Sequence, residues 1–359
     1  MSQKSLELQF LRSLTRYLLE NKIEWMKIIV RAPNWIGDSV LALPAVRSLS
    51  KNFPEAQIWI AAKHWVKDLF QSQDFIKGII PLPAADDIKS MRNSAKIMKA
   101  FDFDTGVLLA NSFGSALLFY LAKIPHRWGY SRDGRGFLLT RKISLKRSKN
   151  SLHQADYYMA LISGLGLKIH SPKLFLPLTP EEKEDARKLL FSHGLELKRP
   201  LVILNPGASY GPAKRWPAKN YAELGRLLQD RDKASILITG SADEDELAHS
   251  IASLMTTKPL VLTGQTDLRR LAGLISQSKL FVTNDSGPMH MANALGVPVI
   301  AIFGPTDPGT TGPFQDPAVV IKKDAVCWPC SYRDCPFDHR CMTAIAPEEI
   351  LAACQRFLS

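Results

Sequence analysis

The sequence predicts an α/β protein made of two doubly wound domains, each a parallel sheet covered by helices on both faces. The chain has 359 residues, which is more than a single compact core usually holds. Short β-branched runs alternate with helical stretches from Lys27 onward, and a second series of the same kind starts after Pro200. Hydrophobic residues make up 46% and charged residues 22% of the chain, which is the balance of an ordinary globular protein.

The first series predicts an N-terminal domain over residues 26–175. Its strand-like runs are rich in Ile, Val and Leu, a composition that favours strands buried on both faces. The predicted strands are 27–31, 57–62, 78–82 and 105–110, and the predicted helices are 39–52, 64–72, 86–100 and 113–123.

The second series predicts a C-terminal domain over residues 201–359, after a connection at 176–200 in which prolines surround one charged helix. The predicted strands are 201–206, 235–240, 260–264, 280–285 and 297–304, and the predicted helices are 218–230, 242–254, 267–276 and 287–295, with a further helix at the terminus. Open sheets of this kind bind ligands at the carboxyl ends of their strands, so we expect the site there, in a cleft between the two domains.

Residues 1–25 precede the first predicted strand and form a separate N-terminal extension. Its apolar residues are spaced as one face of a helix: Leu6, Phe10, Leu14, Tyr17 and Leu18. This face could dock on the body of the protein or touch a membrane surface, and a translation start at Met26 would remove it.

The chain shows no signal for a membrane span or for secretion. No apolar run approaches the roughly 20 residues that a helix needs to cross a bilayer. The N-terminus also lacks the basic, apolar and small-residue order of a secretory signal. We therefore expect a cytoplasmic protein.

Basic residues outnumber acidic ones by 46 to 34, for a net charge of +12. The segment from Lys123 to Lys149 holds nine Lys or Arg residues and one Asp, a net charge of +8. It predicts either a solvated surface or a surface for an anionic partner, meaning nucleic acid, an acidic membrane or a phosphorylated substrate. No nucleic-acid-binding signature accompanies the segment, so nucleic acid is the weaker choice.

A carboxylate stands in the elbow between the first strand and the first helix. The stretch "IIVRAPNWIGDSVLAL" ends its apolar run, turns through Pro33 and Gly37, and places Asp38 just before a pattern of helical spacing. An acid at this position can cap the helix, or act as a base toward a ligand held above the sheet.

The loop "NPGASYGPAKRWP" at 205–217 follows a predicted strand and precedes a helix. Its small residues can bring backbone N–H groups close to an anion, to which Lys214 adds a positive charge. The alternative is an ordinary connection whose cations are merely solvated. The spacing of a P-loop is absent.

A second glycine-bearing turn lies in "FVTNDSGPMHMANALGVPV" at 281–299. The strand ends at Asp285, and Ser286 and Gly287 lead into a helix that carries His290. Its first N–H groups form an anion site, although Asp285 or Ser286 could serve only as caps and His290 could serve only in packing. Together the two turns predict binding of a diphosphate. No G-x-G-x-x-G follows the first strand, so a nicotinamide or flavin site is not supported.

Four cysteines lie close together in "CWPCSYRDCPFDHRC": Cys327, Cys330, Cys335 and Cys341. Close thiols in a cytosolic chain suggest a structural metal such as zinc, with His339 nearby. The spacing is not that of two matched C-x-x-C knuckles, so reduced, partly buried thiols are the other interpretation.

These motifs together resemble the ADP-heptose–lipopolysaccharide heptosyltransferases of glycosyltransferase family 9. The likeness runs from Met26 to the C-terminus, with "VRAPNWIGDSVLALPAVRSL", "NPGASYGPAKRWP", "TNDSGPMHMANALGVPVIAIFGPT" and the cysteine-rich loop in the right order. It implies the GT-B glycosyltransferase fold, with two facing Rossmann-like domains that bind the acceptor in the N-terminal half and the donor in the C-terminal half.

The resemblance implies an inverting transfer of L-glycero-D-manno-heptose from ADP-heptose to the first heptose of the lipopolysaccharide inner core. The enzyme would work at the cytoplasmic face of the inner membrane, without a required cofactor or nucleic-acid partner. Two alternatives stay open. One is a family member with a different acceptor, the heptosyltransferase I type, and the other is a non-catalytic nucleotide-binding protein of the same fold.

The resemblance also implies roles for particular residues. Asp38 would be the general base, and Lys214 would bind and neutralise the departing diphosphate. The further donor-binding candidates are Ser209, Tyr210, Asp243, Gln265, Asp285, Ser286, Gly287 and His290. Among these, Asp285 would hold heptose hydroxyls, Gln265 would lie near adenine, and Asp243 near the ribose. The acceptor-binding candidates are Arg127, Arg132 and Arg135.

Overall fold

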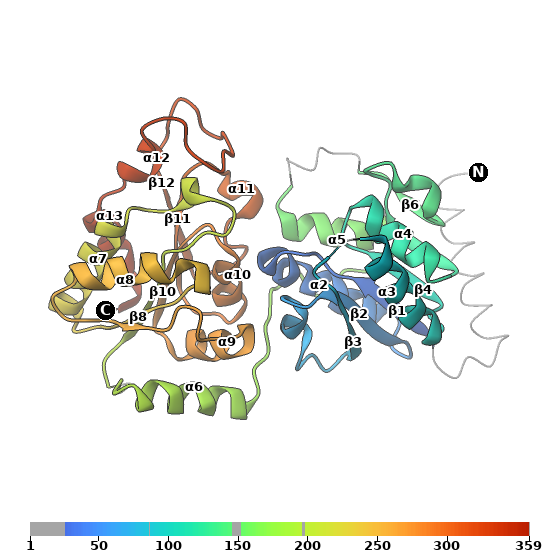
Figure 1. Ribbon diagram of the computed structural model, residues 1–359, viewed down its shortest axis with the longest axis horizontal. Helices are drawn as coiled ribbons and strands as arrows, with labels where there is room; N and C mark the ends of the chain where they lie inside the picture. The colour runs from blue at the N-terminus through green and yellow to red at the C-terminus, as the bar shows by residue number, and fades with distance from the viewer. Residues whose placement is uncertain (1–25, 86, 146–151, 196–197, 359) are drawn as a thin grey trace. The chain divides into compact units, whose positions relative to one another are not determined.

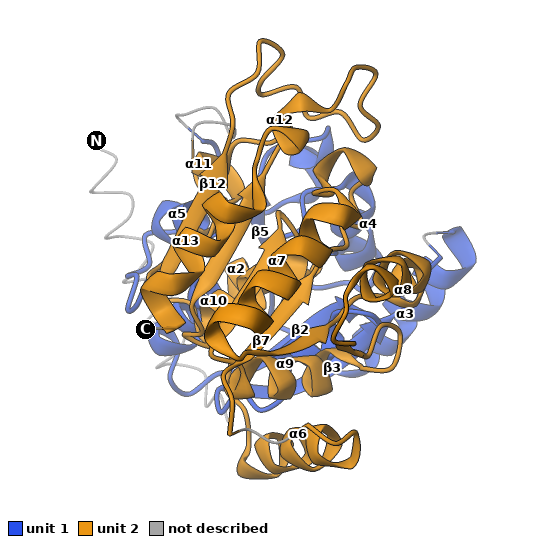
Figure 2. Cartoon of the chain, turned by 90° about the vertical axis from the view of Figure 1, so that its left-hand side faces the viewer, with its two compact units in different colours: residues 1–34, 44–147, 156–172 blue, residues 35–43, 148–155, 173–359 orange. Residues whose placement is uncertain are grey.

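The computed structural model describes residues 26–85, 87–145, 152–195 and 198–358, and these form two compact α/β units (Figure 2). The predicted extension 1–25 lies outside the described residues. Unit 1 comprises Met1–Asn34, Pro44–Arg147 and Asp156–Pro172, and unit 2 comprises Trp35–Leu43, Ser148–Ala155 and Lys173–Ser359. Two short pieces of the N-terminal half, 35–43 and 148–155, therefore group with the C-terminal half.

Unit 1 contains a six-stranded parallel sheet in the order β3-β2-β1-β4-β5-β6. The strands are β1 (Lys27–Arg31), β2 (Gln57–Lys63), β3 (Ile76–Leu82), β4 (Thr105–Leu108), β5 (His126–Tyr130) and β6 (Arg141–Ile143). The α-helices of the N-terminal half are α2 (Ile36–Asn52), α3 (Ile88–Ala100), α4 (Phe113–Leu121) and α5 (Gln154–Gly164). Chain order and strand order together give the doubly wound arrangement that the sequence predicts.

Unit 2 contains a second six-stranded parallel sheet, in the order β12-β11-β10-β7-β8-β9. The strands are β7 (Leu201–Asn205), β8 (Ser235–Ile238), β9 (Leu260–Val261), β10 (Leu280–Asn284), β11 (Val299–Phe303) and β12 (Ala318–Lys322). The α-helices are α6 (Pro180–Ser192), α7 (Ala218–Asp232), α8 (Asp245–Leu254), α9 (Leu268–Gln277), α10 (Gly287–Ala294), α11 (Pro308–Thr311), α12 (Arg340–Thr343) and α13 (Pro347–Leu358). Counted along each unit, the strand order is the same in both sheets.

The central strands are apolar along their whole length because helices cover both faces of each sheet. Every residue of β7, β10 and β11 is buried, as expected for parallel strands inside an α/β layer structure. On one side of the second sheet α7 packs between α8 and α13 (Figure 2). The buried Trp216 anchors this layer, with its indole N–H 3.0 Å from the carbonyl oxygen of Ile345.

The charged helix predicted within the connection 176–200 is α6, which packs on α9 within unit 2 (Figure 1). Thr179 and Glu182 form a capping box at its start. Glu182 also accepts a hydrogen bond of 2.6 Å from Arg269 of α9. Gly273 permits this contact, since a Cβ there would lie 2.9 Å from the carbonyl oxygen of Glu182.

Several short elements differ from the sequence prediction. The helix predicted at 64–72 is wrong, because the chain forms only a 3-10 helix, Lys67–Phe70, between β2 and β3. The strands β5, β6 and β12 were not predicted, since β5 ("HRWGY") and β6 ("RKI") lie inside the basic segment and lack an apolar run. In the part of the chain that the structure describes, none of the helices has the length and apolar character to cross a bilayer.

Candidate functional site

The two glycine-bearing turns of unit 2 meet at the carboxyl ends of β7 and β10. These two strands are neighbours in the sheet, and the strand order reverses between them. The loop after β7 therefore lies beside the turn into α10, as expected for the ligand end of an open parallel sheet. The prediction that both turns contribute to one site agrees with this topology.

The centre of this site is an ion pair between Lys214 and Asp285, both nearly buried. The Lys214 ammonium donates to Asp285 Oδ2. The same oxygen accepts a hydrogen bond of 2.6 Å from the hydroxyl of Thr306, a contact that the sequence did not suggest. The ammonium also lies 4.7 Å from the ring centroid of Tyr210. Removing either partner would leave the other charge buried and uncompensated.

Asn284, the last residue of β10, ties the Lys214 loop to the sheet. Its side-chain oxygen accepts hydrogen bonds from the Trp216 N–H at 3.1 Å and from the Tyr221 hydroxyl at 3.0 Å. Its side-chain nitrogen donates to the carbonyl oxygen of Pro206 at 2.6 Å. These contacts fix both ends of the loop, so the position of Lys214 follows from the sheet itself.

The helix α10 begins at Gly287, after Ser286, with Pro288 in its first turn. Pro288 lacks an N–H group and has the backbone angle of a helix start. The Ser286 hydroxyl lies 3.0 Å from that of Thr283, which holds the turn against β10. The first N–H groups of α10 therefore lie at the same strand ends as Lys214.

The first turn of α2 packs directly on α10, and both segments belong to unit 2. A Cβ on Gly287 would lie 2.8 Å from the Ile36 Cβ, and a Cβ on Gly37 would lie 2.7 Å from the His290 Cδ2. Each close approach needs a residue without a side chain. The next residue is Asp38, which is half-buried in the first turn of α2. The helix begins at Ile36, so Asp38 is its third residue and not the one that precedes it.

His290 is buried and neutral. Burial, with smaller contributions from His153 and Lys214, lowers its pKa to about 3. Its Nδ1 is buried and has no hydrogen-bond partner among the described residues. A neutral imidazole at this position can donate or accept one hydrogen bond without bringing in a charge.

The buried acid near the end of β8 is Glu244 and not its predicted neighbour Asp243, which is exposed. One carboxylate oxygen of Glu244 accepts a hydrogen bond of 2.8 Å from the Ser241 N–H. A Cβ on Gly207 would lie 1.9 Å from the other oxygen, so the glycine after β7 makes room for this carboxylate. The capping-box pattern Ser-x-x-Glu was the sequence signal that could have identified Glu244.

The remaining donor candidates lie on the surface of the same loops. Ser209 is exposed and Tyr210 is half-buried. Gln265 is exposed and follows Gly264, which has a left-handed backbone conformation. Gly264 lies against Ala242, since a Cβ added to Gly264 would lie 2.9 Å from the Ala242 Cα. The Gln265 turn and the Glu244 segment are therefore adjacent.

The cysteine-rich loop 327–341 is hydrogen-bonded to the loop that carries Lys214. The Ala213 N–H donates to the Arg333 carbonyl oxygen at 3.0 Å. The Ala213 carbonyl oxygen accepts a hydrogen bond of 2.7 Å from His339 Nε2. The Tyr210 hydroxyl donates to the Ser331 carbonyl oxygen at 2.7 Å. The cysteine-rich loop thus braces the Lys214 loop on the side away from the sheet interior.

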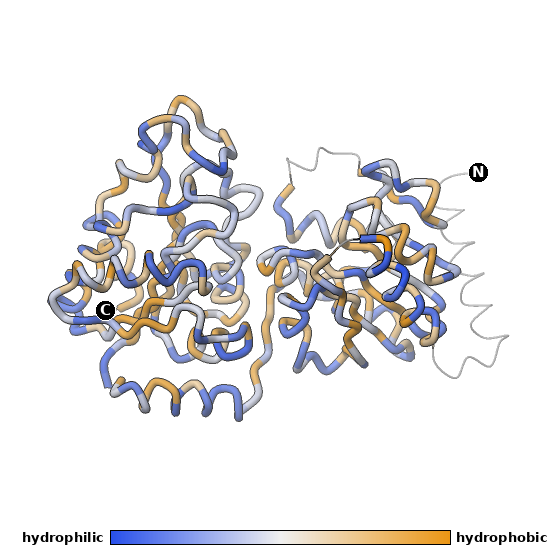
Figure 3. Tube along the Cα trace, in the orientation of Figure 1, coloured by the Kyte–Doolittle hydropathy of each residue, from blue (hydrophilic) through white to orange (hydrophobic). Residues whose placement is uncertain are grey.

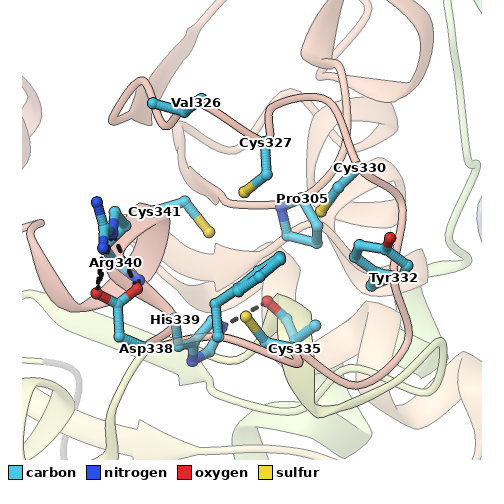
Figure 4. A pocket seen from close by; sticks show the side chains of 12 residues that line it. Pro305, Val326, Cys327, Cys330, Tyr332, Cys335, Asp338, His339, Arg340 and Cys341 are labelled. Carbon is cyan, nitrogen blue, oxygen red and sulfur yellow. Dashed lines mark hydrogen bonds and ion pairs between the residues drawn. The ribbon is translucent and has the colours of Figure 1, made fainter.

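The four thiols of that loop point toward one pocket of about 270 Å³ (Figure 4). Burial and the neighbouring thiols raise the pKa of Cys341 to about 11, so this thiol is protonated at neutral pH. No group of three or more His, Cys, Asp or Glu side chains is arranged to hold a metal ion within the described ranges. The metal site stays a prediction.

Of the three predicted acceptor-binding arginines, Arg135 is fully buried, which corrects its assignment to a charged surface. Its guanidinium donates to Tyr130 O at 3.0 Å, to Ser115 Oγ and Asn111 Oδ1 at 3.1 Å, and to Ala110 O. The glycine before it takes a left-handed conformation and starts a 3-10 helix that turns Arg135 inward. Arg127 is half-buried, with its Nε 2.7 Å from Leu138 O. Arg132 is exposed.

Comparison with known proteins places this site in a family. Residues 91–340 match the model of glycosyltransferase family 9 (heptosyltransferase). Lipopolysaccharide heptosyltransferase 2 of Salmonella typhimurium is 33% identical over 308 residues, covering 83% of this chain and 88% of the relative. Lipooligosaccharide heptosyltransferase 2 of Campylobacter jejuni is 29% identical over 343 residues, covering 93% and 98%.

Solved structures show the same fold. The structure of Escherichia coli ADP-heptose lipopolysaccharide heptosyltransferase II has a TM-score of 0.79 and 30% identity, covering 93% of this chain and 98% of that one. A family 9 glycosyltransferase from Veillonella parvula has a TM-score of 0.83 at 24% identity, covering 94% and 98%. Together with the two parallel sheets, these likenesses confirm the predicted fold class.

Proposed function

Because this chain belongs to glycosyltransferase family 9, the heptosyltransferase family, we propose that it moves L-glycero-D-manno-heptose from ADP-heptose to the first heptose of the lipopolysaccharide inner core. Relatives at 30–33% identity are named lipopolysaccharide or lipooligosaccharide heptosyltransferase 2, which supports heptose transfer to a lipopolysaccharide acceptor. The observation that carries the proposal is the buried Lys214–Asp285 pair at the start of α10. Its Lys214 ammonium, held in place by Asp285, is the positive group that a diphosphate leaving group would meet.

The diphosphate of the donor binds between Lys214 and the first N–H groups of α10. Negative charge grows on the departing ADP as the glycosidic bond breaks, and a preformed ammonium and aligned N–H groups stabilise that charge without rearranging. Asp285 keeps the ammonium in place before the donor arrives and then accepts hydrogen bonds from heptose hydroxyls. Ser209 and Tyr210 line the same loop. In this proposal the diphosphate needs no metal ion, because the Lys214 ammonium and the N-terminus of α10 provide the positive charge that stabilises it.

The adenosine part of the donor lies toward β8. The Glu244 carboxylate has one oxygen engaged by the Ser241 N–H and the other facing Gly207, so it can accept hydrogen bonds from two ribose hydroxyls. We assign this role to Glu244 in place of the exposed Asp243. The adjacent Gln265 turn contacts the adenine ring.

Asp38 acts as the general base. The acceptor hydroxyl gives its proton to the Asp38 carboxylate while its oxygen forms the new bond to the anomeric carbon of heptose, and the old carbon–oxygen bond breaks to release ADP. This single displacement inverts the anomeric configuration. The close packing of Gly37 on His290 and of Ile36 on Gly287 supports the placement, because it fixes the turn that carries Asp38 beside the donor-binding helix. The neutral His290 contributes a hydrogen bond to the bound sugar.

The acceptor carries phosphates and carboxylates, and exposed cations of the basic segment, Arg132 among them, contribute to its binding. A family member of the heptosyltransferase I type would use the heptose-free acceptor instead.

The decisive experiment is detection of heptose transfer by mass spectrometry, with monoheptosylated and with heptose-free Kdo–lipid A as acceptors. We expect transfer to the monoheptosylated acceptor and a loss of at least a hundredfold in kcat for Asp38→Asn, as for removal of a general base. Transfer only to the heptose-free acceptor would assign the type I activity. Unchanged turnover of Asp38→Asn would exclude Asp38 as the base, and absence of transfer to both would contradict the proposed function.

A further inference from the structure

Unit 1 has a cationic groove that the proposed chemistry does not use. It lies along α3 and the last residue of α4 and has a volume of about 510 Å³. Its lining residues are Ile88, Lys89, Arg92, Asn93, Ala95, Lys96, Lys99 and Leu121. Four of these are cations, and α3 itself contains no acidic residue. The nearest described acid, Asp87, accepts hydrogen bonds from the Ser90 N–H and hydroxyl at the start of the helix.

Large apolar side chains are exposed around the same groove. Ile88 is 68% and Ile97 is 52% exposed on α3, although Ala95 and Met98 of the same helix are buried. Leu121 is 39% exposed at the groove's other wall. The helix thus has one face in the core and an outer side with the four cations, flanked by the exposed Ile88 and Ile97. Hydrophilic and hydrophobic residues follow one another along α3 in Figure 3.

The exposed apolar surface continues along α4, which packs beside α3. Phe113 and Tyr120 are seven residues apart, so they share one face of α4, and they are 41% and 52% exposed. Beyond them lies Phe137, 73% exposed, with its ring centroid 6.0 Å from that of Phe113. A monomeric protein seldom exposes so many large apolar side chains beside one another without a partner.

We propose that the outer face of α3 and α4 docks on an anionic phospholipid bilayer. The aliphatic and aromatic side chains would enter the boundary between headgroups and acyl chains. The lysines and arginine would lie along that boundary, with their ammonium and guanidinium groups among the lipid phosphates. This inference rests on the proposed function in one respect, because an acceptor anchored in a lipid requires the enzyme to work at a bilayer surface.

The composition of the face distinguishes a bilayer from other anionic partners. Nucleic acid is bound by cations interleaved with aromatic rings available for stacking, whereas the residues that line the cationic groove include aliphatic side chains and no aromatic ring. A small anion would need a closed cluster of donors. This face instead places four cations along the outer side of α3, with Ile88 and Leu121 among the residues that line the same groove.

Binding to vesicles that contain no acceptor tests the proposal. Full-length protein is sedimented with vesicles of phosphatidylcholine alone, and with vesicles that also contain phosphatidylglycerol. We expect binding to the anionic vesicles, with an affinity that falls as salt is added. The double variant Arg92→Glu, Lys96→Glu should bind at least tenfold more weakly, because it reverses two charges at the surface. The double variant Ile88→Ser, Leu121→Ser should also bind more weakly, by loss of apolar insertion.

The matched control is Lys183→Glu, Lys188→Glu, which reverses two exposed lysines of α6. It should bind anionic vesicles as the unaltered protein does. Equal binding by the Arg92/Lys96 variant and the unaltered protein, or equal binding to neutral and anionic vesicles, would overturn the proposal. Circular dichroism establishes that each variant is folded.

Heptose transfer separates this inference from the proposed function. With acceptor in detergent micelles, the Arg92/Lys96 variant should keep its kcat and its acceptor KM, whereas with acceptor in anionic vesicles its rate should fall about tenfold. A raised KM in micelles would make the groove an acceptor subsite and overturn the bilayer assignment. Vesicle binding by a protein that transfers no heptose would leave the docking surface standing and contradict the proposed function alone.

Discussion

The burial of Arg135 shows how a charged side chain can serve the fold rather than a ligand. Its guanidinium donates to two backbone carbonyl oxygens and two side-chain oxygens inside unit 1. Burial lowers its pKa to about 10, so it keeps its charge at neutral pH. Net charge along the sequence located the basic segment but could not separate Arg135 from Arg132, because the chain between them turns through two left-handed residues, Asp133 and Gly134.

We predict that Arg135→Ala lowers the free energy of unfolding by about 3 kcal/mol, because it orphans several buried acceptors. Urea denaturation measures this change. The matched variant Arg132→Ala removes an exposed arginine three residues away and should stay within about 0.5 kcal/mol of the unaltered protein. An equal loss in both variants would contradict the structural role of Arg135.

Glu244 and Asp243 provide a matched pair of neighbouring acids. Glu244→Gln keeps a side-chain oxygen for the Ser241 N–H but removes the charge that ribose hydroxyls would meet. We expect ADP to bind at least tenfold more weakly to this variant, since hydrogen bonds to a charged group contribute about 1.5–3 kcal/mol. Asp243→Asn should change the affinity less than twofold. Calorimetric titration with ADP measures both, and the reverse order would restore Asp243 as the ribose ligand.

The buried His290 makes stability depend on pH. Its pKa is about 3 in the folded protein and has the ordinary value of about 6.5 in the unfolded chain. Between these two values the unfolded chain binds more protons, so the contribution of His290 is fully present above about pH 6.5. It is lost as the pH falls, by up to about 1.4 kcal/mol per pH unit.

His290→Gln should therefore show a shallower loss of stability between pH 7 and pH 5 than the unaltered protein. Urea denaturation at several pH values measures the two slopes. The comparison concerns slopes, so a constant cost of repacking does not affect it. The control variant His249→Gln replaces an exposed histidine and should keep the original slope. Identical slopes for His290→Gln and the unaltered protein would show that the imidazole is not buried in its neutral form.

At the scale of elements, the sequence predicted the strands and helices whose apolar residues recur with a clear pattern. The strands β1, β7, β10 and β11 carry almost unbroken apolar runs because helices cover both faces of their sheets, and these were all predicted. The strands β5 and β6 were missed because neither carries an apolar run. β5 pairs with β4 and β6 and buries Trp128, Gly129 and Tyr130, whereas β6 is the three-residue edge strand.

The contact between the cysteine-rich loop and the Lys214 loop could not be read from the sequence either, since over a hundred residues separate His339 from Ala213. We predict that His339→Ala weakens ADP binding about three- to tenfold, because loss of one hydrogen bond of about 1 kcal/mol loosens the loop that carries Lys214. Titration with ADP measures the effect. His193→Ala, which removes an exposed histidine after α6, is the control, and equal affinities in both variants would show that the brace has no influence.

At the scale of the whole molecule, both units repeat one strand order, and in each sheet that order reverses between the two central strands. The alternation of strands and helices sufficed to predict this architecture. The sequence could not show that residues 35–43 group with unit 2, because the grouping depends on contacts between residues that are distant in the chain, such as the close approach of Gly287 to Ile36.

That grouping determines where this protein can be recombined with a relative. A chimera that exchanges only residues from 173 onward would join the foreign α10 to the native Ile36–Gly37 turn. At that contact the spacing leaves no room for an added Cβ. We predict that such a hybrid loses activity and melts at a lower temperature, and that exchanging residues 35–43 as well restores both. Equal melting temperatures for the two hybrids, measured by calorimetry, would contradict this. If the two hybrids differ as predicted, the residues that fit around α10 are encoded in two separate stretches of the gene, and exchanging one stretch without the other lowers stability.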